Sequence, residues 1–352
     1  MKISNVASIV NTKIDASILT AHTYISTECM LPNCGGIENS SSIPNGKVTS
    51  FDKNDILLSN IRPYFKKLWF STRSGGCSND VICLRVTNRE CLPKYLYYAL
   101  CTDKFIDSFS ASSKGTKMPR GDKNALLTYE IPDRNIEDQL HIVDILGSID
   151  EKIENNEQLI NIFENLAAKK YLDFANKTFT KIRLEDVIEL FDSKRIPLSS
   201  REREQRKGIY PYYGATGILD YVNGFLFSGE YVLFAEDGTV TDTNGHPIVQ
   251  LVNGSFWVNN HAHILKGKNG WNDYTLYVAL KQLNVDKAVT GAVQPKINQA
   301  NLLSLEIPNL SNNNLQTTNT ELDIVFHKVF HLRSENKKLQ ELKELYLKKF
   351  FE

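Results

Sequence analysis

The chain has 352 residues, 41% of them hydrophobic and 23% charged, which is enough for two or three globular domains with cores of their own. Lysine and arginine (41) balance aspartate and glutamate (41), and a net charge of zero argues mildly against a stand-alone nucleic-acid-binding protein, whose surface is usually basic. No apolar run reaches the roughly 20 residues of a membrane span, and the N-terminus has no secretory pattern, so we expect a cytoplasmic protein. The six cysteines all lie in the first half without a CxxC pair, and we expect them to be free thiols rather than zinc ligands.

Residues 1–134 show the short strand-like runs and glycine-containing turns of an α+β domain, and a local excess of positive charge lies between residues 47 and 73. The commonest explanation of such a run is a solvated basic turn, but clustering with asparagine and tyrosine favours a loop that contacts phosphates or base edges. We expect Arg62, held by Pro63, to read a base, and the flexible Lys66 and Lys67 to contact phosphate. The candidate contact residues here are Asn60, Arg62, Tyr64, Lys66 and Lys67, followed by Ser78 and Asn79.

A polar loop follows, just before a Leu-Leu-x-x-x-Ile-Pro segment that we interpret as a strand. Its candidate contact residues are Lys114, Thr116, Lys117 and Arg120. Residues 115–132 align without a gap on residues 291–308, an offset of 176, and residues 96–100 recur as residues 276–280, an offset of 180. A repeat this long is a duplicated domain rather than a solenoid, and it predicts two similar binding sites related by a pseudo-two-fold axis. The counterparts of the loop residues are Thr290, Gln294 and Lys296.

Each copy ends in a long segment, residues 135–176 and 313–352, in which apolar residues recur every three or four positions. This spacing predicts two long helices that pack as an antiparallel coiled coil. Asn156 and Asn336 fall in the two apolar seams, where each either fixes the register or lies solvated on a helix edge; the sequence leaves both readings open. The seam residues are Ile142, Leu146, Ile149, Ile153 and Asn156 in the first segment, and Leu322, Val325, Val329, Leu332, Asn336 and Leu339 in the second.

Residues 177–312 form the second domain, whose strands align with those of the first. We match residues 55–62 with 230–237, which places Glu236 and Asp237 opposite Ile61 and Arg62 and argues against a catalytic carboxylate pair; carboxylates can instead accept a hydrogen bond from cytosine. A glycine-bounded loop offers tyrosine and threonine hydroxyls and backbone N–H groups to phosphate; the alternative is that its aromatics cap the core. The candidate contact residues are Tyr212, Tyr213, Thr216, Glu236, Asp237, Asn259, Asn260 and His261.

Two patterns suggest chemistry that we do not expect. His261 and His263 alternate along a strand, but no acidic or cysteine partner lies at ligand spacing, so no metal site is expected. Asp133 followed by Asp150 and Lys152 spells the pattern of a Mg²⁺-dependent nuclease, which needs both acids on neighbouring strands; here the second part falls in the helical seam, and the other copy lacks it. Walker A and GxGxxG motifs are also absent from the sequence. No catalytic residue is therefore assigned.

The second domain carries motifs that resemble those of target-recognition domains in specificity subunits of type I restriction-modification systems. These motifs are Tyr-Pro-Tyr-Tyr-Gly-Ala-Thr-Gly at residues 210–217, Glu-Tyr-Val-Leu-Phe-Ala-Glu-Asp-Gly at 230–238 and Trp-Val-Asn-Asn-His-Ala-His at 257–263. Residues 55–64 and 76–80 resemble another class of the same domain. The resemblance covers essentially the whole chain, including the order head, helix, head, helix.

The resemblance implies that two modification subunits, which methylate adenine with S-adenosylmethionine, dock along the helices, and that ATP-dependent restriction subunits join them. It also implies that this chain holds no cofactor itself, since S-adenosylmethionine, ATP and Mg²⁺ belong to partner subunits. Two different heads on one scaffold predict a bipartite, asymmetric site in double-stranded DNA with an unread spacer. The alternatives are the specificity subunit of another multi-subunit DNA methylation system, a stand-alone nuclease, and a coiled-coil interaction protein without a DNA function.

Overall fold

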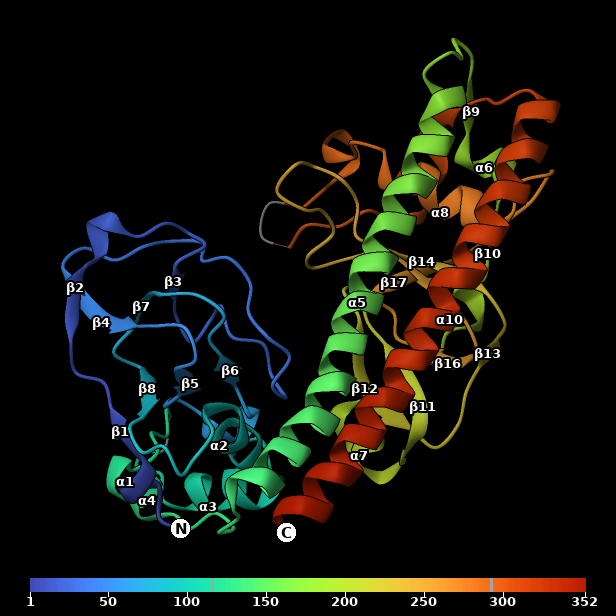
Figure 1. The fold of residues 1–352 in the computed structure, drawn as a ribbon. Coiled ribbons are helices and arrows are strands. Elements are labelled where there is room, and N and C mark those ends of the chain that lie inside the picture. The colour runs from blue at the N-terminus through green and yellow to red at the C-terminus, as the bar shows by residue number, and fades with distance from the viewer. Residues whose placement is uncertain (116, 292–293) are drawn as a thin grey trace. The chain divides into compact units, whose positions relative to one another are not determined.

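The structure is a computed structural model, and it describes residues 1–115, 117–291 and 294–352. The chain divides into two compact units, Met1–Asn155 with Asn336–Glu352, and Asn156–Glu335. Two helices, α5 (Ile136–Ala175) and α10 (Asn312–Phe351), contribute one half to each unit (Figure 1). Each helix begins in the unit of the head that precedes it and ends in the other unit. This exchange is the connectivity of a pseudo-two-fold repeat.

Within residues 1–115 and 117–134 the structure describes fourteen short elements, and the two four-stranded sheets of this first head have the orders β1-β8-β5-β6 and β2-β4-β7-β3. The elements are α1 (Ile3–Val6), β1 (Ala7–Ile9), β2 (Lys13–Asp15), η1 (Ala16–Ile18), β3 (Tyr24–Ile25), β4 (Lys47–Phe51), β5 (Ile56–Ser59), η2 (Pro63–Phe65), β6 (Leu68–Phe70), β7 (Gly75–Cys77), β8 (Val81–Val86), α2 (Pro93–Leu100), α3 (Asp103–Ala111) and α4 (Lys123–Thr128).

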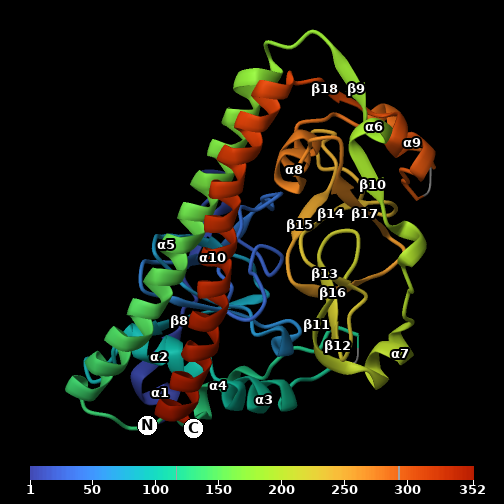
Figure 2. The same ribbon diagram turned by 90° about the vertical axis from the view of Figure 1, so that its right-hand side faces the viewer.

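The second head repeats this arrangement, with sheet orders β10-β17-β14-β15 and β12-β11-β16-β13 and a short β18-β9 pair (Figure 2). The elements are β9 (Lys181–Arg183), α6 (Leu184–Val187), β10 (Ile188–Leu190), η3 (Asp192–Lys194), α7 (Ser200–Gln205), β11 (Lys207–Tyr213), β12 (Ile218–Val222), β13 (Phe227–Ser228), β14 (Tyr231–Ala235), β15 (Val249–Val252), β16 (Ser255–Val258), β17 (Ala262–Gly267), α8 (Asp273–Lys281), η4 (Asp286–Ala288), α9 (Gln299–Ser304) and β18 (Glu306–Pro308).

The central strand of each head is buried on both faces. In β5, Ile56 and Leu58 belong to the core shared with the helices, whereas Leu57 belongs to the core between the two sheets. In β14, Val232 faces the helix core and Leu233 faces the second sheet. The two-residue alternation of a strand delivers apolar side chains to both sides, so each head is built as a helix layer, a sheet and a second sheet.

Each long helix is fixed to its own head by the same contact. Gln139 of α5 is fully buried, and its amide accepts from Leu92 N (2.8 Å) and donates to Glu90 O (2.7 Å). Asn319 of α10 takes the corresponding place and donates to Gly270 O at 2.6 Å. Both side chains satisfy backbone groups at the turn before the helix that covers the sheet, α2 or α8.

The helix halves also pair with each other inside each unit, in antiparallel order. In the second unit, Asn156 Nδ2 donates to Glu335 Oε2 (2.8 Å) and Lys170 lies 2.9 Å from Glu321. In the first unit, Lys343 Nζ lies 2.6 Å from Asp150 Oδ1. The predicted fold class, α+β with two similar heads and two long antiparallel helices, is confirmed.

The predicted seam residues are buried or half-buried, as a coiled-coil stripe requires. Asn156 is fully buried and Asn336 is 9% exposed, so of the two readings left open the solvated one does not hold. Ile153 and Leu339 are the half-buried members of the seam. In the part of the chain that the structure describes, no helix combines the length and apolar character of a membrane span.

Two details of the strand interpretation need correction. The two leucines of the repeated Leu-Leu-x-x-x-Ile-Pro segment lie on short helices, α4 and α9, because Asp122 and Asn298 cap them by accepting from backbone N–H groups two or three residues later. The isoleucine and proline that follow belong to a strand, β18, in the second head only.

The second correction concerns the alignment of the central strands, which was one residue out. The hydrogen bond from Arg62 N to Pro119 O (2.8 Å) recurs as one from Gly238 N to Pro295 O (3.0 Å), so the offset here is 176. Arg62 therefore corresponds to Gly238, Asn60 to Glu236 and Ile61 to Asp237.

Candidate nucleic-acid interface

Many of the predicted contact residues meet at one end of the central sheet of each head. There the central strand ends, and the loop containing residues 114–120 or 290–296 pairs with it through the bridges Ile61–Arg120 and Asp237–Lys296. We call these places the polar edges. The first polar edge consists of Asn60, Arg62, Asn79, Asp80, Lys114 and Arg120, and the second of Glu236, Asp237, Asn260, His261, Thr290 and Lys296.

The first polar edge presents basic side chains from a fixed backbone. Arg62 is exposed and adopts a left-handed conformation (φ 50°), which is uncommon for a residue other than glycine and is followed by Pro63. Arg120 is exposed and pairs with Asp80 at 2.8 Å. Asn60 is 8% exposed, and its Oδ1 has no hydrogen-bond partner among the described residues. The two guanidinium groups can donate to phosphate oxygens or to base edges, whereas Asn60 Oδ1 can only accept.

The three predicted contact residues that come after Pro63 differ in their availability to DNA. Tyr64 is 54% exposed. Lys66 Nζ lies 2.7 Å from Asp103, with its side chain only 15% exposed, and Lys67 Nζ donates to Thr27 O at 2.8 Å. Both lysines already have partners within the head, which weakens the expectation that they serve mainly as phosphate contacts.

The second polar edge has a different chemistry. His261 is half-exposed, and its Nδ1 contacts Asp237 Oδ1, which fixes the orientation of the ring. Lys296 Nζ lies 3.1 Å from Glu236 Oε1, so the predicted reader Glu236 is turned towards its own head. Asn259 is 5% exposed and its side chain accepts from His261 N (2.8 Å), so it shapes this turn from within.

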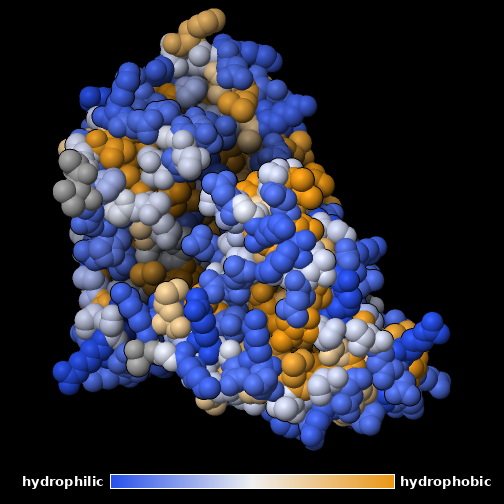
Figure 3. Space-filling model, turned by 90° about the vertical axis from the view of Figure 1, so that its left-hand side faces the viewer, coloured by the Kyte–Doolittle hydropathy of each residue, from blue (hydrophilic) through white to orange (hydrophobic). Residues whose placement is uncertain are grey.

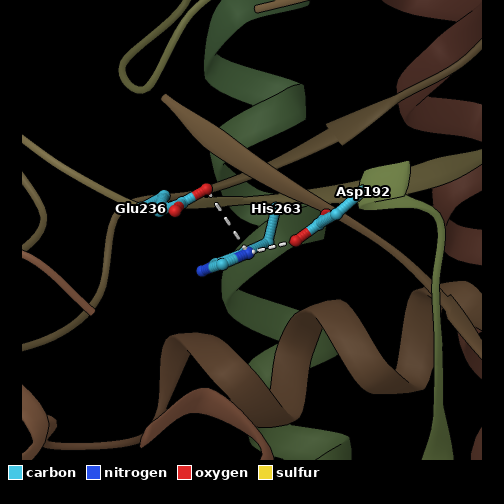
Figure 4. A group of neighbouring side chains, drawn as sticks. All are labelled: Asp192, Glu236 and His263. Carbon is cyan, nitrogen blue, oxygen red and sulfur yellow. Dashed lines mark hydrogen bonds and ion pairs between the residues drawn. The ribbon is translucent and has the colours of Figure 1, made fainter. Parts of the chain in front are cut away.

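Behind the second polar edge lies a buried ionic cluster of Asp192, Glu236 and His263 (Figure 4). His263 is fully buried; its Nδ1 lies 2.6 Å from Asp192 Oδ2, and its Nε2 lies 2.8 Å from the carbonyl oxygen of Ile297. Each ring nitrogen of His263 therefore faces an oxygen atom, a carboxylate oxygen at Nδ1 and a backbone carbonyl oxygen at Nε2. Arg195 Nη1 completes the cluster at 2.6 Å from Glu236 Oε2.

The electrostatics of the cluster favour ion pairing over metal binding. Burial raises the pKa of Asp192, but hydrogen bonds from His263, Gln299 and Ile264 outweigh it and hold the pKa below its ordinary value. Arg195, His263 and Lys296 lower the pKa of Glu236 against the opposing effect of burial in the same way. Two carboxylates and an imidazole converge here, yet Arg195 and Lys296 already pair with Glu236, and both ring nitrogens of His263 already contact oxygen atoms of the protein. The group fits a structural ion-pair cluster.

The glycine-bounded loop of the second head is divided between core and surface. Tyr212 is 1% exposed, and its hydroxyl donates to Leu198 O and accepts from Leu198 N, so the core-capping alternative describes it. Tyr213 is half-buried and Thr216 is exposed. Gln250 Nε2 holds this loop through the carbonyl oxygens of Gly214 and Ala215, both at 3.0 Å.

The remaining predicted contacts lie mainly at the surface. Thr116 falls outside the described residues. The exposed ones are Asn79, Lys114, Lys117, Asn260, Thr290 and Gln294, while Ser78 is half-buried.

The nuclease pattern does not form a site. Asp150 lies on α5, where it accepts from Tyr98 Oη (2.8 Å) and pairs with Lys343, rather than on a strand beside Asp133. Asp133 and Asp150 therefore do not lie on neighbouring strands, so the pattern of Asp133, Asp150 and Lys152 does not form the nuclease site that this alternative requires.

Sequence reasoning missed two groups. Asp192 and Arg195 carry the ionic cluster but lie 71 and 41 residues from His263 and Glu236, so no local spacing marks them. The β11–β12 hairpin was noted only for its aromatic loop, yet it exposes Ile209 (79%), Leu219 (56%) and Tyr221 (46%). Figure 3 shows that hydrophobic residues also gather in patches within the mainly hydrophilic surface of the face that it draws. A strand whose exposed face is apolar is the signal that could have identified this hairpin.

Two heads with equivalent polar edges and interlocked long helices define a class of duplicated recognition proteins. The family model "Type I restriction modification DNA specificity domain" matches residues 10–165 and again residues 176–344. The chain therefore belongs to the family of type I restriction-modification DNA specificity domains.

Relatives and a solved structure agree with this assignment. A type I restriction enzyme specificity subunit of Haemophilus influenzae is 38% identical over 125 residues, which are 36% of this chain and 31% of the relative. The EcoprrI specificity subunit of Escherichia coli is 26% identical over 106 residues, 30% of this chain and 25% of the relative. The alignments thus span less than a third of these curated relatives. The crystal structure of the type I restriction-modification S subunit from M. genitalium has the same fold, with a TM-score of 0.60, 19% identity and coverage of 100% of this chain and 95% of that one.

Proposed function

We propose that this chain is the DNA sequence-specificity subunit of a type I restriction-modification complex. It reads a bipartite, asymmetric site in double-stranded DNA, one half with each head, and carries no catalytic residues of its own. The observation that supports this most directly is the repetition of the polar edge: the same backbone bridge (Ile61–Arg120, Asp237–Lys296) presents different side chains in the two heads. One scaffold with two different surfaces suits two different half-sites.

The chain also assembles the complex in this proposal. Two modification subunits bind S-adenosylmethionine and methylate adenine, and restriction subunits bind ATP and Mg²⁺, so this chain needs no cofactor. The assembly works in the cytoplasm, where the DNA and the cofactors are. A specificity subunit of another multi-subunit DNA methylation system is the nearest alternative, and co-purification of this chain with or without an ATP-dependent translocase distinguishes the two.

Exchange of one head tests the recognition role. Residues 1–134 are replaced by the first head of a family member that recognises a different sequence, and adenine methylation is mapped in cells that contain the assembled methyltransferase. The donor must keep an apolar surface for Ile142, Leu146, Leu347 and Phe351, because these helix residues complete the core of the first head.

We expect the base sequence of one half of the methylated motif to change, while the base sequence of the other half stays the same. The reciprocal exchange of residues 177–312 is the matched control and should change the opposite half. A change of both halves on either exchange would reject the assignment of one half-site to each head.

A further inference from the structure

The first unit contains a cleft of about 590 Å³ that the recognition role does not use. It lies between the loop around Cys34, the end of α2, and the halves of α5 and α10 in this unit. Cys34 and Cys101, which are 67 residues apart in the chain, both line it, and their Sγ atoms are 3.2 Å apart. All six cysteines of the protein are free thiols, and these two are close enough to react with each other.

Cys34 is the accessible and acidic member of the pair. It is half-exposed, whereas Cys101 is 1% exposed. The contact with Cys101 lowers the pKa of Cys34 against the effect of burial, and the ammonium groups of Lys343 and Lys66 lower it further, although Asp150 opposes them. Burial raises the pKa of Cys101. An attacking thiolate next to a protonated resolving thiol is the arrangement that thiol–disulfide exchange uses.

The other cysteines are poor competitors. Burial raises the pKa of Cys77 to about 12 and that of Cys91 to about 11, and it raises the pKa of Cys83 as well. Cys29 is 5% exposed. An oxidant that enters from solvent therefore meets Cys34 first.

The loop of Cys34 is hydrogen-bonded to the backbone that follows Arg62 of the first polar edge. Asn33 and Cys34 both have a φ of 55°, a conformation that bends the chain sharply. In this bend Asn33 N donates to Phe65 O (3.0 Å) and Cys34 N donates to Lys66 O (2.8 Å). The backbone that follows Arg62 is thus held by the loop that carries the reactive thiol.

We propose that Cys34 and Cys101 form a reversible thiol–disulfide pair that couples oxidation to the loop of residues 62–67. With a small-molecule disulfide as oxidant, the Cys34 thiolate attacks one of its sulfur atoms and releases one thiolate. The Cys101 thiol then loses its proton and attacks Cys34 Sγ, which releases the second thiolate. The two cysteines are oxidised, the small disulfide is reduced to two thiols, and the Sγ atoms approach by about 1.2 Å to the length of a disulfide bond.

The test uses the full chain and oxidised glutathione as the probe. After oxidation, free thiols are alkylated under denaturing conditions and the cysteine-containing peptides are identified by mass spectrometry. We expect a Cys34–Cys101 cross-linked peptide two hydrogen masses lighter than the sum of its parts, and full alkylation of Cys29, Cys77, Cys83 and Cys91. A cross-link between any other pair, or alkylation of both Cys34 and Cys101, would overturn the proposal.

Two variants and one dynamic measurement sharpen the result. Cys101→Ser should stop the reaction at a glutathione adduct on Cys34, and Cys34→Ser should prevent any reaction; an adduct on Cys101 in the latter variant would contradict the assigned order of attack. Hydrogen exchange of residues 62–67 should slow at least threefold on oxidation, while residues 238–248, which lead to the equivalent strand β15 in a head without cysteines, stay unchanged. Unaltered hydrogen exchange at residues 62–67 would contradict the proposed coupling between oxidation and this loop.

Discussion

The two heads share the backbone of the polar edge but differ in what supports it. Asp237 and Lys296 repeat the bridge of Ile61 and Arg120. Behind the second edge lies the buried cluster around His263, whereas the first head has Ile82 at that place and instead buries Asp55, which accepts two hydrogen bonds from Arg85 (2.8 and 2.6 Å). The repeated main-chain contacts preserve the geometry of the edge, while charges behind it can be rearranged head by head. This independence is what a protein with two exchangeable recognition surfaces requires.

The largest difference between the heads should appear when the cluster of the second head is broken. Asp192→Ala removes the buried carboxylate that pairs with Arg195 and accepts from His263, Gln299 and Ile264 N, which should cost about 3–5 kcal/mol of unfolding free energy. Urea denaturation followed by hydrogen exchange measures this loss in Asn156–Glu335 separately from the first unit. The matched control is Asn11→Ala, at the equivalent but exposed position of the first head, which should change stability by about 0.5 kcal/mol or less. Equal losses of unfolding free energy in both variants would show that the cluster does not stabilise the second head.

The same cluster predicts an acid-sensitive contribution to stability. The pKa values of Asp192 and Glu236 are lowered in the folded protein from ordinary values of 3.8 and 4.5. Their contribution is therefore fully present at neutral pH and is lost as the pH falls below about 4. The difference in unfolding free energy between the wild type and Asp192→Ala should shrink as the pH falls from about 5 towards 3. A difference that stays unchanged over this range would show that the Asp192 carboxylate does not contribute as an ionised group.

Base reading should be sharper at Arg62 than at its counterpart, because Gly238 has no side chain to offer. In the assembled methyltransferase, Arg62→Ala should relax the preference at one base position of one half-site by about 1–3 kcal/mol. Arg89→Ala removes the same charge from an exposed turn beyond the other end of β8 and serves as the control. Binding to cognate and scrambled duplexes separates the two effects. Equal weakening on both duplexes would leave Arg62 with a phosphate contact only.

The sequence was sufficient for the repeat, the two helices and the seam, because residues that recur at offsets of 176 and 180 and an apolar period of three to four residues can be recognised in the sequence directly. It was not sufficient for the register of the central strands. Residues 56–58 and 231–235 are apolar throughout, so neighbouring alignments bury equally well, and only the hydrogen bond of Gly238 N to Pro295 O decides between them. The ion-pair partners of Lys66 and His263 could not be predicted from the sequence either, because Asp103 and Asp192 come from distant parts of the chain.

The smallest effect is expected for the two lysines that sequence reasoning placed on phosphate. Lys66 is paired with Asp103, and Lys67 donates to a backbone carbonyl, so neither ammonium is available without breaking a contact in the first head. A double substitution of both residues by alanine should lower stability by about 1 kcal/mol and change the salt dependence of DNA binding by less than one counterion. Lys114, whose side chain is 86% exposed and lies 3.5 Å from Asp122, should behave differently. Lys114→Ala should reduce the slope of log K against log salt by about one, equally on cognate and scrambled DNA, without a change in stability. If the double variant instead reduced the slope by two and Lys114→Ala left it unchanged, DNA would lie along the loop of residues 62–67 rather than across the bridge of Lys114 and Arg120.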